Sequence, residues 1–383
     1  MLIFMIKLIN RLILEPILDK LSKSNKIVII YGARQVGKTT LANQVIARLG
    51  IKVLKINADE RKYHDILSSR DLDKMKSLVI GYELLFIDEA QRIENIGINL
   101  KILADGIKDL KIIATGSSSF ELANKIKEPL TGRTWTYNLY PLSFLELSQI
   151  YNDFELKNQL DNFLIYGGYP EVFTTENLND KKRLLEEIST LYLYKDILEL
   201  ENIKKSEKIY KLLKLLAFQI GQEVSVNELA INLELSHEKV RKYLDLMEKS
   251  FIIFRLPALS KNPRKEIAKK DKIYFYDLGV RNVVIGNFNS LDDRNDQGAL
   301  FENFLVSERI KKNKHQERSV SGYFWRAYTG SEIDYAEEEA GELRVYEFKY
   351  GKNKAKMPQK FIDTYGQSEF KIINKDNFLE FII

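Results

Sequence analysis

Residues 26–49, "KIVIIYGARQVGKTTLANQVIARL", constrain the fold more than any other part of the chain. They run from an apolar, β-branched segment through a glycine turn into a segment with helical periodicity. The turn holds Gly32, Gly37, Lys38 and Thr39 in the spacing G-x-x-x-x-G-K-T, a complete Walker A motif. A plain glycine turn before a helix is the alternative, but strand, loop and helix all stand in the required order. The segment therefore predicts an α/β domain with a phosphate-binding loop.

A loop of this kind binds phosphate through its backbone, because its N–H groups converge at the positive end of the next helix dipole. We expect Lys38 to contact the β- and γ-phosphates and the Thr39 hydroxyl to bind magnesium. The expected nucleotide-binding residues are Gly32, Arg34, Gln35, Val36, Gly37, Lys38, Thr39 and Thr40. ATP and Mg²⁺ are therefore the expected cofactors.

A second apolar segment, "ELLFIDEAQRI", predicts a buried strand that ends at Asp88 and Glu89. Asp88 would hold magnesium through its water shell, and Glu89 would orient or deprotonate the attacking water. Two surface acids at a strand end are the alternative, which the apolar run before them disfavours. The pair favours hydrolysis over binding alone.

Two more polar positions complete the expected catalytic set. The segment "LKIIATGSSSFEL" predicts a strand whose end offers Ser117 to the γ-phosphate or the water, with Thr115 and Ser118 as rivals. Arg133, in the loop "LTGR", would stabilise the phosphoryl transition state from its own or a neighbouring subunit. An ion pair between Arg133 and a surface carboxylate is an equally good interpretation.

Composition limits the other functions that the chain can have. Its 383 residues favour two or three domains, and the absence of cysteine excludes disulfides and thiolate zinc sites. The three histidines follow no metal-ligand spacing, so carboxylate-bound magnesium is the expected metal. The net charge of +5 permits nucleic-acid binding without demonstrating it.

The N-terminal segment "MLIFMIKLINRLIL" is apolar but is interrupted by Lys7 and Arg11. It is too short to span a bilayer, and no signal-type cleavage site follows it. We expect an amphipathic helix here that leads into the first domain. The chain is expected to be cytoplasmic, with no membrane partner.

The middle of the chain predicts a helix-turn-helix and a strand, in "SVNELAINLELSHEKVRKYLDLMEKSFIIFRL". The second helix would bury Val240, Tyr243, Leu244 and Met247, which follow helical spacing. The loop "SKNPRKEIAKKDK" before the next strand is rich in lysine, as a DNA-binding wing would be. The expected DNA contacts are Lys239, Arg241, Lys242, Arg264 and Lys265. Solvated lysines on an interdomain module are the alternative.

The C-terminal stretch "GSEIDYAEEEAGELRVYEFKYGK" predicts two neighbouring strands that carry Asp334 and Glu347. The second strand is apolar on both faces at its centre, so Glu347 and Lys349 are expected to be paired or to bind a metal. Glu332 is expected on the same face as Asp334, and a preceding helix supplies Glu302. Magnesium held by these carboxylates, with Lys349 positioning a water, would form a nuclease site. A purely structural Glu–Lys pair is the alternative.

Motifs along nearly the whole chain resemble one family. They are "YGARQVGKTTL", "LLFIDEAQRI", "ATGSSSFEL", "LTGR", "YPLSFLEL", "YGGYPEV", "LYKDILE", "ALFENFLVSE" and "EIDY…YEFKYG". In this order they resemble the AAA+-related ATPases of bacteria and archaea that carry a C-terminal domain of unknown function related to restriction endonucleases. That resemblance implies a P-loop ATPase, a middle winged helix and a nuclease-like C-terminal fold.

We therefore expect an α/β chain in four segments. These are a P-loop AAA+-like ATPase domain (1–150), a helical lid or linker (151–204), a winged-helix domain (205–290) and a restriction-endonuclease-like domain (291–383). The expected function is Mg-dependent ATP hydrolysis that remodels or translocates DNA, by a homo-oligomer whose tail carries the nuclease site. The alternative is a nucleotide switch that regulates a protein partner and has an inactive tail.

Overall fold

The computed structural model describes residues 9–116, 130–189, 206–261, 270–351 and 354–383. The chain divides into two compact units. Unit 1 comprises Met1–Tyr140 and Lys249–Phe251, and unit 2 comprises Pro141–Glu248 and Ile252–Ile383. The segments expected to be a lid, a winged helix and a nuclease-like domain therefore fall together in unit 2. Within the described residues, no helix is long and apolar enough to cross a membrane.

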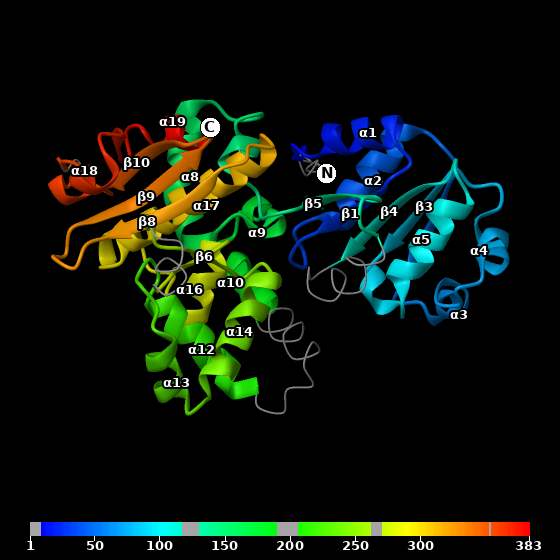
Figure 1. The fold of residues 1–383 in the computed structure, drawn as a ribbon, viewed down its shortest axis with the longest axis horizontal. Coiled ribbons are helices and arrows are strands. Elements are labelled where there is room, and N and C mark those ends of the chain that lie inside the picture. Colours follow the sequence, from blue (N-terminus) through cyan, green and yellow to red (C-terminus); the bar gives the residue numbers. More distant parts are fainter. Residues whose placement is uncertain (1–8, 117–129, 190–205, 262–269, 352–353) are drawn as a thin grey trace. The chain divides into compact units, whose positions relative to one another are not determined.

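Unit 1 is built on a five-stranded sheet (Figure 1). Its strands are β1 (Ile27–Tyr31), β2 (Val53–Asn57), β3 (Leu84–Asp88), β4 (Lys111–Gly116) and β5 (Thr134–Asn138). They lie in the order β2-β3-β4-β1-β5, and every neighbouring pair is parallel. The two sequence segments expected to be Walker strands are thus separated by β4 alone, which brings their carboxyl ends to one edge.

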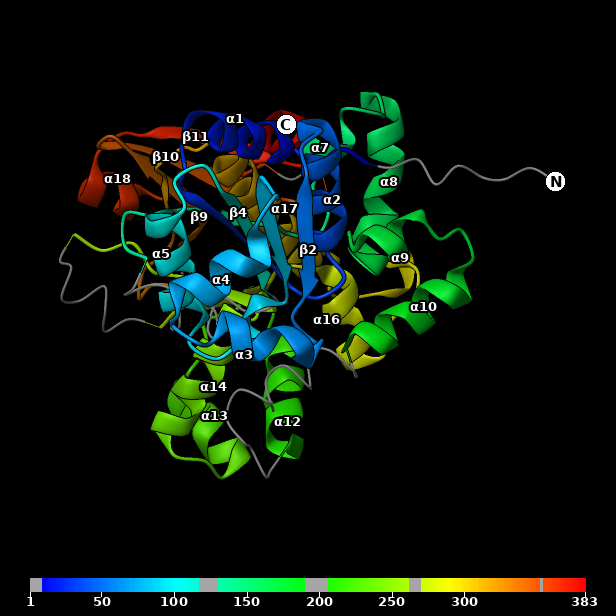
Figure 2. The ribbon, with the colours of Figure 1, turned by 90° about the vertical axis from the view of Figure 1, so that its right-hand side faces the viewer.

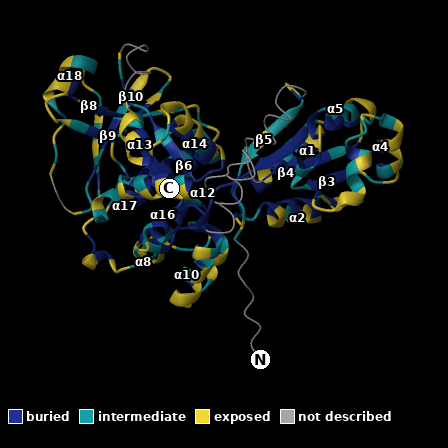
Figure 3. Cartoon of the chain, turned by 90° about the horizontal axis from the view of Figure 1, so that it is seen from below, coloured by how far each residue is buried: buried dark blue, intermediate teal, exposed yellow. Residues whose placement is uncertain are grey.

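Helices cover both faces of this sheet, with α2 and α5 on opposite sides (Figure 3). The helical segments of unit 1 are α1 (Leu14–Lys23), α2 (Lys38–Leu49), η1 (Arg61–Tyr63), α3 (His64–Leu67), α4 (Leu72–Val79), η2 (Ala90–Arg92) and α5 (Ile96–Gly106). Strands β1, β3 and β4 are buried along most of their length, as the apolar segments predicted. Most of the segment expected to form an N-terminal helix, residues 1–8, lies outside the described residues; residues 9–13 are not helical, and α1 begins at Leu14.

Unit 2 begins with helices (Figure 2). They are α7 (Phe144–Leu147), α8 (Asp153–Tyr166), α9 (Pro170–Thr174), α10 (Leu178–Glu187), α12 (Ser206–Phe218), α13 (Val226–Leu233) and α14 (His237–Lys249). An antiparallel hairpin of β6 (Ile253–Leu256) and β7 (Lys272–Phe275) follows, and then α16 (Leu278–Ile285) and η4 (Leu291–Asp293). Helix α14 buries the four predicted residues Val240, Tyr243, Leu244 and Met247.

The Gly-Gly turn after α8 is held by a carboxylate from distant sequence. Asp277, which caps α16, accepts a hydrogen bond of 2.7 Å from the Gly168 N–H. Gly167 has a φ of +73°, and a Cβ there would lie 2.2 Å from an Asp277 oxygen. Only glycine fits both the backbone conformation and the space. This contact joins the first helices of unit 2 to the segment that follows the hairpin.

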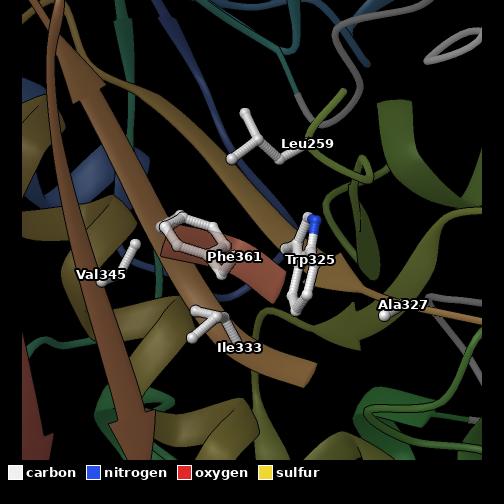
Figure 4. Packing of buried hydrophobic residues seen from close by; sticks show 7 residues of the cluster. Leu259, Trp325, Ala327, Ile333, Val345 and Phe361 are labelled. Atoms are coloured by element: carbon white, nitrogen blue, oxygen red, sulfur yellow. The ribbon is translucent and has the colours of Figure 1, made fainter. Parts of the chain in front are cut away.

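The end of unit 2 is a four-stranded sheet in the order β11-β10-β9-β8. Its elements are α17 (Gln297–His315), β8 (Ser321–Arg326), β9 (Glu332–Glu339), β10 (Glu342–Phe348), α18 (Gln359–Tyr365), β11 (Glu369–Ile373) and α19 (Phe378–Ile382). Strands β8, β9 and β10 are antiparallel neighbours, whereas β10 and β11 are parallel. On one face, Phe361 of α18 packs edge-on against Trp325 and lies beside Ile333 and Val345 (Figure 4).

A β-bulge interrupts the alternation of β9. Tyr323 and Trp325 of β8, two residues apart, pair with Ala336 and Ile333, which are three residues apart. The extra residue lies on β9 between Ile333 and Ala336, in the stretch that contains Asp334. Bulges of this kind redirect a side chain from its regular face. Glu332 and Asp334 nevertheless lie on the same side, as expected, because the charges of both act on Lys272 and Lys349.

Candidate functional site

The phosphate-binding loop has the backbone geometry that its sequence predicted. Gly37 precedes α2 with a φ of +96°, and Gln35 has a φ of +60°. A Cβ on Gly32 would lie 2.3 Å from the Leu139 carbonyl oxygen, so that position also requires glycine. Of the other predicted contacts, Val36 is buried, whereas Arg34 is partly exposed and Gln35 and Thr40 are exposed. The first turn of α2 thus opens directly from the loop, where backbone N–H groups are free of helical partners.

Lys38 lies across this loop. Its side chain is 5% exposed, and its Nζ donates hydrogen bonds of 3.0 Å to the carbonyl oxygens of Gly32 and Ala33. The Glu89 carboxylate is 4.0 Å away. A buried ammonium that donates to backbone carbonyl oxygens at the base of a phosphate-binding loop suits an anionic ligand. The placement fits a lysine that contacts nucleotide phosphates.

Asp88 connects the loop helix to two strands. The Thr39 hydroxyl donates to Asp88 Oδ2 at 2.8 Å, and the Thr115 hydroxyl donates to Asp88 Oδ1. The Glu89 N–H in turn donates to the Thr115 oxygen at 3.1 Å. The structure therefore brings together Thr39, Asp88 and Glu89 as predicted, at the carboxyl edge of the sheet. A hydroxyl and a carboxylate side by side are the oxygen donors that magnesium bound to a nucleotide requires.

Glu89 has an unusual backbone conformation for a non-glycine residue, with a φ of +53°. Its Oε2 accepts a hydrogen bond of 2.5 Å from Gln91, which is buried. A left-handed conformation at a polar residue beside a site is held by its surroundings and is common at functional positions. The motif gave no indication of Gln91, whose amide orients this carboxylate.

Thr115, a rival in the sequence interpretation, is fully buried and bonded to Asp88. Ser117, the preferred residue, and Ser118 lie outside the described residues. The contact of Thr115 with Asp88 and with the Glu89 N–H makes it a positioning residue for the pair. Thr115 pairs with Ile30 of β1, and this register sets the position of Thr115 along β4.

Arg133 lies at the opposite edge of the sheet from the loop. Its carbonyl oxygen accepts from the Ile27 N–H at the start of β1, whereas the loop follows the end of that strand. At about 3.3 Å per residue, five residues of strand separate the two edges by roughly 16 Å. Its Nε donates to Asp105 Oδ1 at 3.0 Å. Within one chain, Arg133 is therefore an ion-paired residue away from the Walker residues.

The sequence interpretation did not identify Arg11 as part of this site. Arg11 is 6% exposed, and its Nη1 and Nη2 donate to the carbonyl oxygens of Val36 and Tyr140, at 2.8 and 2.5 Å. A charge-assisted bond to Val36 fixes the loop residue just before Gly37. The only signal in the sequence was an arginine interrupting an apolar run.

The predicted DNA contacts divide into two sets. Lys239, Arg241 and Lys242 are exposed on α14, on the side away from its buried stripe. Arg264 and Lys265 lie outside the described residues.

The four predicted residues of the tail lie together in unit 2. Asp334 Oδ2 accepts a 2.7 Å hydrogen bond from the Phe348 N–H, which places it beside the segment that carries Glu347 and Lys349. Lys349 Nζ donates to Glu347 Oε1 at 2.6 Å. Over the described residues, however, no group of three or more histidine, aspartate or glutamate side chains has an arrangement that could hold a metal ion. We call Glu302, Asp334, Glu347 and Lys349 the acidic cluster.

Asp334 is the residue of the acidic cluster whose pKa is shifted most strongly. It is 5% exposed, and burial raises the pKa of its carboxyl to about 8, with further contributions from the charges of Glu302 and Glu347. The hydrogen bond from Phe348 and the charge of Lys272 act in the opposite direction but are outweighed. Asp334 is therefore largely protonated at neutral pH in the folded protein.

Two residues of the hairpin join the acidic cluster and were not predicted. Lys272 Nζ donates to Glu302 Oε1 at 2.9 Å, and the Tyr274 hydroxyl donates to the same oxygen at 2.6 Å. Burial lowers the pKa of Lys272, but the carboxylates of Glu302, Glu332 and Asp334 outweigh that effect and raise it. Lys272 and Glu302 stand thirty residues apart on different elements, so no local pattern revealed the contact.

Comparison with protein families divides the chain into three matched stretches. Residues 24–148 match the profile of a family described as AAA domain. Residues 157–291 match "Domain of unknown function (DUF8612)", and residues 297–377 match "Domain of unknown function (DUF4143)". The first match covers the sheet, the phosphate-binding loop and the Asp88–Glu89 pair described above.

Relatives of this chain occur in archaea and bacteria. An uncharacterized protein of Methanocaldococcus jannaschii is 28% identical over 304 residues, which cover 74% of this chain and 66% of that protein. An uncharacterized protein of Mycobacterium tuberculosis is 27% identical over 326 residues, which cover 84% of this chain and 70% of that protein. The alignments thus span about two thirds of the length of these relatives.

Solved structures found to be similar to the chain include the Walker-type ATPase PABY2304 of Pyrococcus abyssi, with a TM-score of 0.49 and 15% identity. That match covers 71% of this chain and 94% of the other. The RuvB Holliday junction branch migration motor of Thermotoga maritima follows with a TM-score of 0.34 and 18% identity, over 68% of this chain and 95% of the other. Similarities at this level say nothing of activity.

The raised pKa of Asp334 predicts how stability changes with pH. Between its ordinary pKa and about 8, the folded state binds a proton that the unfolded state does not, so stability falls as pH rises through that window. Asp334→Asn lacks this penalty. Its melting temperature should equal that of the wild type near pH 4 and exceed it by pH 8. The corresponding gain in the free energy of unfolding at pH 8 is on the order of a few kcal/mol.

Glu337→Gln, on the same strand, is the matched control, because the pKa of Glu337 is shifted in the opposite direction. Burial opposes the charge of Glu337, but hydrogen bonds and attraction from Arg309 outweigh it and lower the pKa of Glu337. That substitution should therefore destabilise the protein at neutral pH. Thermal unfolding of the three proteins from pH 4 to 8 makes the comparison. A difference between Asp334→Asn and wild type that does not change with pH would contradict the assignment.

Proposed function

We propose that this chain, which combines an AAA-type P-loop domain with a C-terminal DUF4143 domain, is a magnesium-dependent ATP hydrolase. The observation that carries the proposal is the Thr39–Asp88–Thr115 contact with Glu89 and Lys38 beside it. It combines a metal-binding hydroxyl and carboxylate, a phosphate-binding ammonium and a carboxylate for the water in one place. These are the groups that phosphoryl transfer to water requires.

Each residue has a defined task in this mechanism. The loop backbone and Lys38 bind the phosphates, and Thr39 and Asp88 would hold the magnesium ion. Magnesium, when bound, neutralises phosphate charge in the transition state. Glu89, oriented by Gln91, accepts a proton from the attacking water or aligns it. Arg133 would act only from a neighbouring subunit. Within its own chain, the length of β1 separates it from the phosphate-binding loop by roughly 16 Å.

Hydrolysis would serve to move or remodel DNA held by unit 2. The support is the order of three helices and a hairpin, which a winged helix also has, with Lys239, Arg241 and Lys242 exposed on α14. Exposed cations on one helix suit phosphate contacts. The competing proposal is a nucleotide switch that acts on a protein partner through the same surface.

DNA cleavage by the tail is a further part of the proposal with its own support. Asp334, Glu347, Lys349 and Glu302 come from different elements and meet in one cluster. In a nuclease-like fold, such carboxylates would hold magnesium and the lysine would position the water. Cleavage would therefore require the cluster to leave the arrangement described above, in which these carboxylates form no metal-binding group.

Two substitutions separate ATP binding from ATP hydrolysis. Glu89→Gln should retain ATP binding and lose at least about 100-fold in kcat, because the carboxylate that orients the water is gone. Lys38→Ala should lose binding as well, since it removes a phosphate contact. Nucleotide binding by equilibrium titration and phosphate release at saturating ATP provide the measurements. Equal phosphate release by wild type and Glu89→Gln would contradict the assigned role.

The DNA proposal predicts a dependence on salt. Replacing Lys239, Arg241 and Lys242 by alanine should weaken DNA binding uniformly across sequences and reduce the salt slope by about 1 for each phosphate contact removed. A matched triple substitution of Lys62, Lys74 and Lys76, exposed lysines of unit 1, serves as the control. An ATPase that ignores DNA, together with a stable protein complex, would instead favour the nucleotide switch.

A further inference from the structure

Lys272 occupies an unusual position for a lysine. Its side chain is 3% exposed, and it stands at the start of β7, where it pairs with Leu256 of β6. Its Nζ lies 2.9 Å from Glu302 Oε1 and 5.5 Å from the centre of the Phe324 ring. A buried ammonium is costly unless a carboxylate and hydrogen bonds compensate it, so this lysine is fixed by the acidic cluster.

Glu302 accepts hydrogen bonds from two residues of the hairpin. The same Oε1 atom receives the Lys272 ammonium and the Tyr274 hydroxyl, two donors from one strand. On the other side of the cluster, Lys349 donates to Glu347 Oε1 at 2.6 Å. Two of the carboxylates therefore already have a lysine as counter-ion.

A divalent metal would compete with these donors for the same carboxylates. Magnesium and manganese bind carboxylate oxygens, and Lys272 and Tyr274 already donate to Glu302 Oε1 while Lys349 donates to Glu347 Oε1. A second cation beside a buried ammonium also meets direct repulsion.

We propose that the ammonium of Lys272 is the resident cation of the acidic cluster and keeps it closed to divalent metal ions. Lys272 belongs to the β6–β7 hairpin, whereas the carboxylates belong to α17, β9 and β10. We therefore expect the cluster to bind a divalent ion only when this ammonium is removed. The proposal goes beyond ATP hydrolysis in unit 1 and does not depend on it.

Lys272→Met tests the proposal, because methionine retains the unbranched apolar stem and removes the charge. Without nucleotide, millimolar Mn²⁺ should raise the melting temperature of Lys272→Met by about 3 °C or more and leave that of the wild type unchanged. The electron paramagnetic resonance signal of free Mn²⁺ should fall correspondingly for the variant alone. Lys272→Met/Glu302→Gln should lose the effect, since it lacks a required ligand.

Lys270→Met is the matched control, because Lys270 is exposed and lies two residues earlier. It should behave as the wild type, and ATP turnover should be unchanged in all these variants. A folded Lys272→Met protein that gains no Mn²⁺ binding would overturn the proposal. So would Mn²⁺ binding by the wild type that Glu302→Gln abolishes, a comparison that remains decisive even where Lys272→Met does not fold.

Discussion

The hydrogen bonds that Asp88 accepts from Thr39 and Thr115 are the contacts on which the account of unit 1 depends. They join the first turn of α2 to the ends of β3 and β4, three segments far apart in the sequence. The sheet order makes this possible, because β4 lies between β1 and β3 and all three strands end at the same edge. Lys38 and Glu89 are then placed beside this contact by the loop and by the backbone turn after Asp88.

Unit 2 is organised around buried charge. Asp277 holds the Gly167–Gly168 turn, Arg309 binds Glu337 through two hydrogen bonds, and Lys272 binds Glu302. Each pair joins elements that are distant in the chain. Removing one partner of such a pair leaves an uncompensated buried charge, which is strongly destabilising. These contacts therefore favour one arrangement of the helices, the hairpin and the sheet. The acidic cluster is the place where this network leaves one carboxyl, Asp334, with a strongly raised pKa.

Much of unit 1 could be predicted because its signals are local. An apolar strand, a glycine turn and a helix follow one another in residues 26–49, and Asp88 follows directly on a buried strand. Arg11 and Lys272 could not be predicted, since their partners lie at sequence separations of 25 and 30 residues with no periodicity to relate them. The bulge in β9 could not be predicted either, since it is a shift in the pairing with β8 that no local pattern in β9 indicates.

The central claim is that the loop and the Asp88–Glu89 pair form a magnesium-dependent hydrolytic site. Steady-state phosphate release from ATP, measured with the metal chelated and then after magnesium is restored, tests it most directly. The account predicts no release with chelator and full recovery with Mg²⁺, because Thr39 and Asp88 are placed to hold that ion with the phosphates. Release that persists without metal, or that magnesium fails to restore, would contradict it.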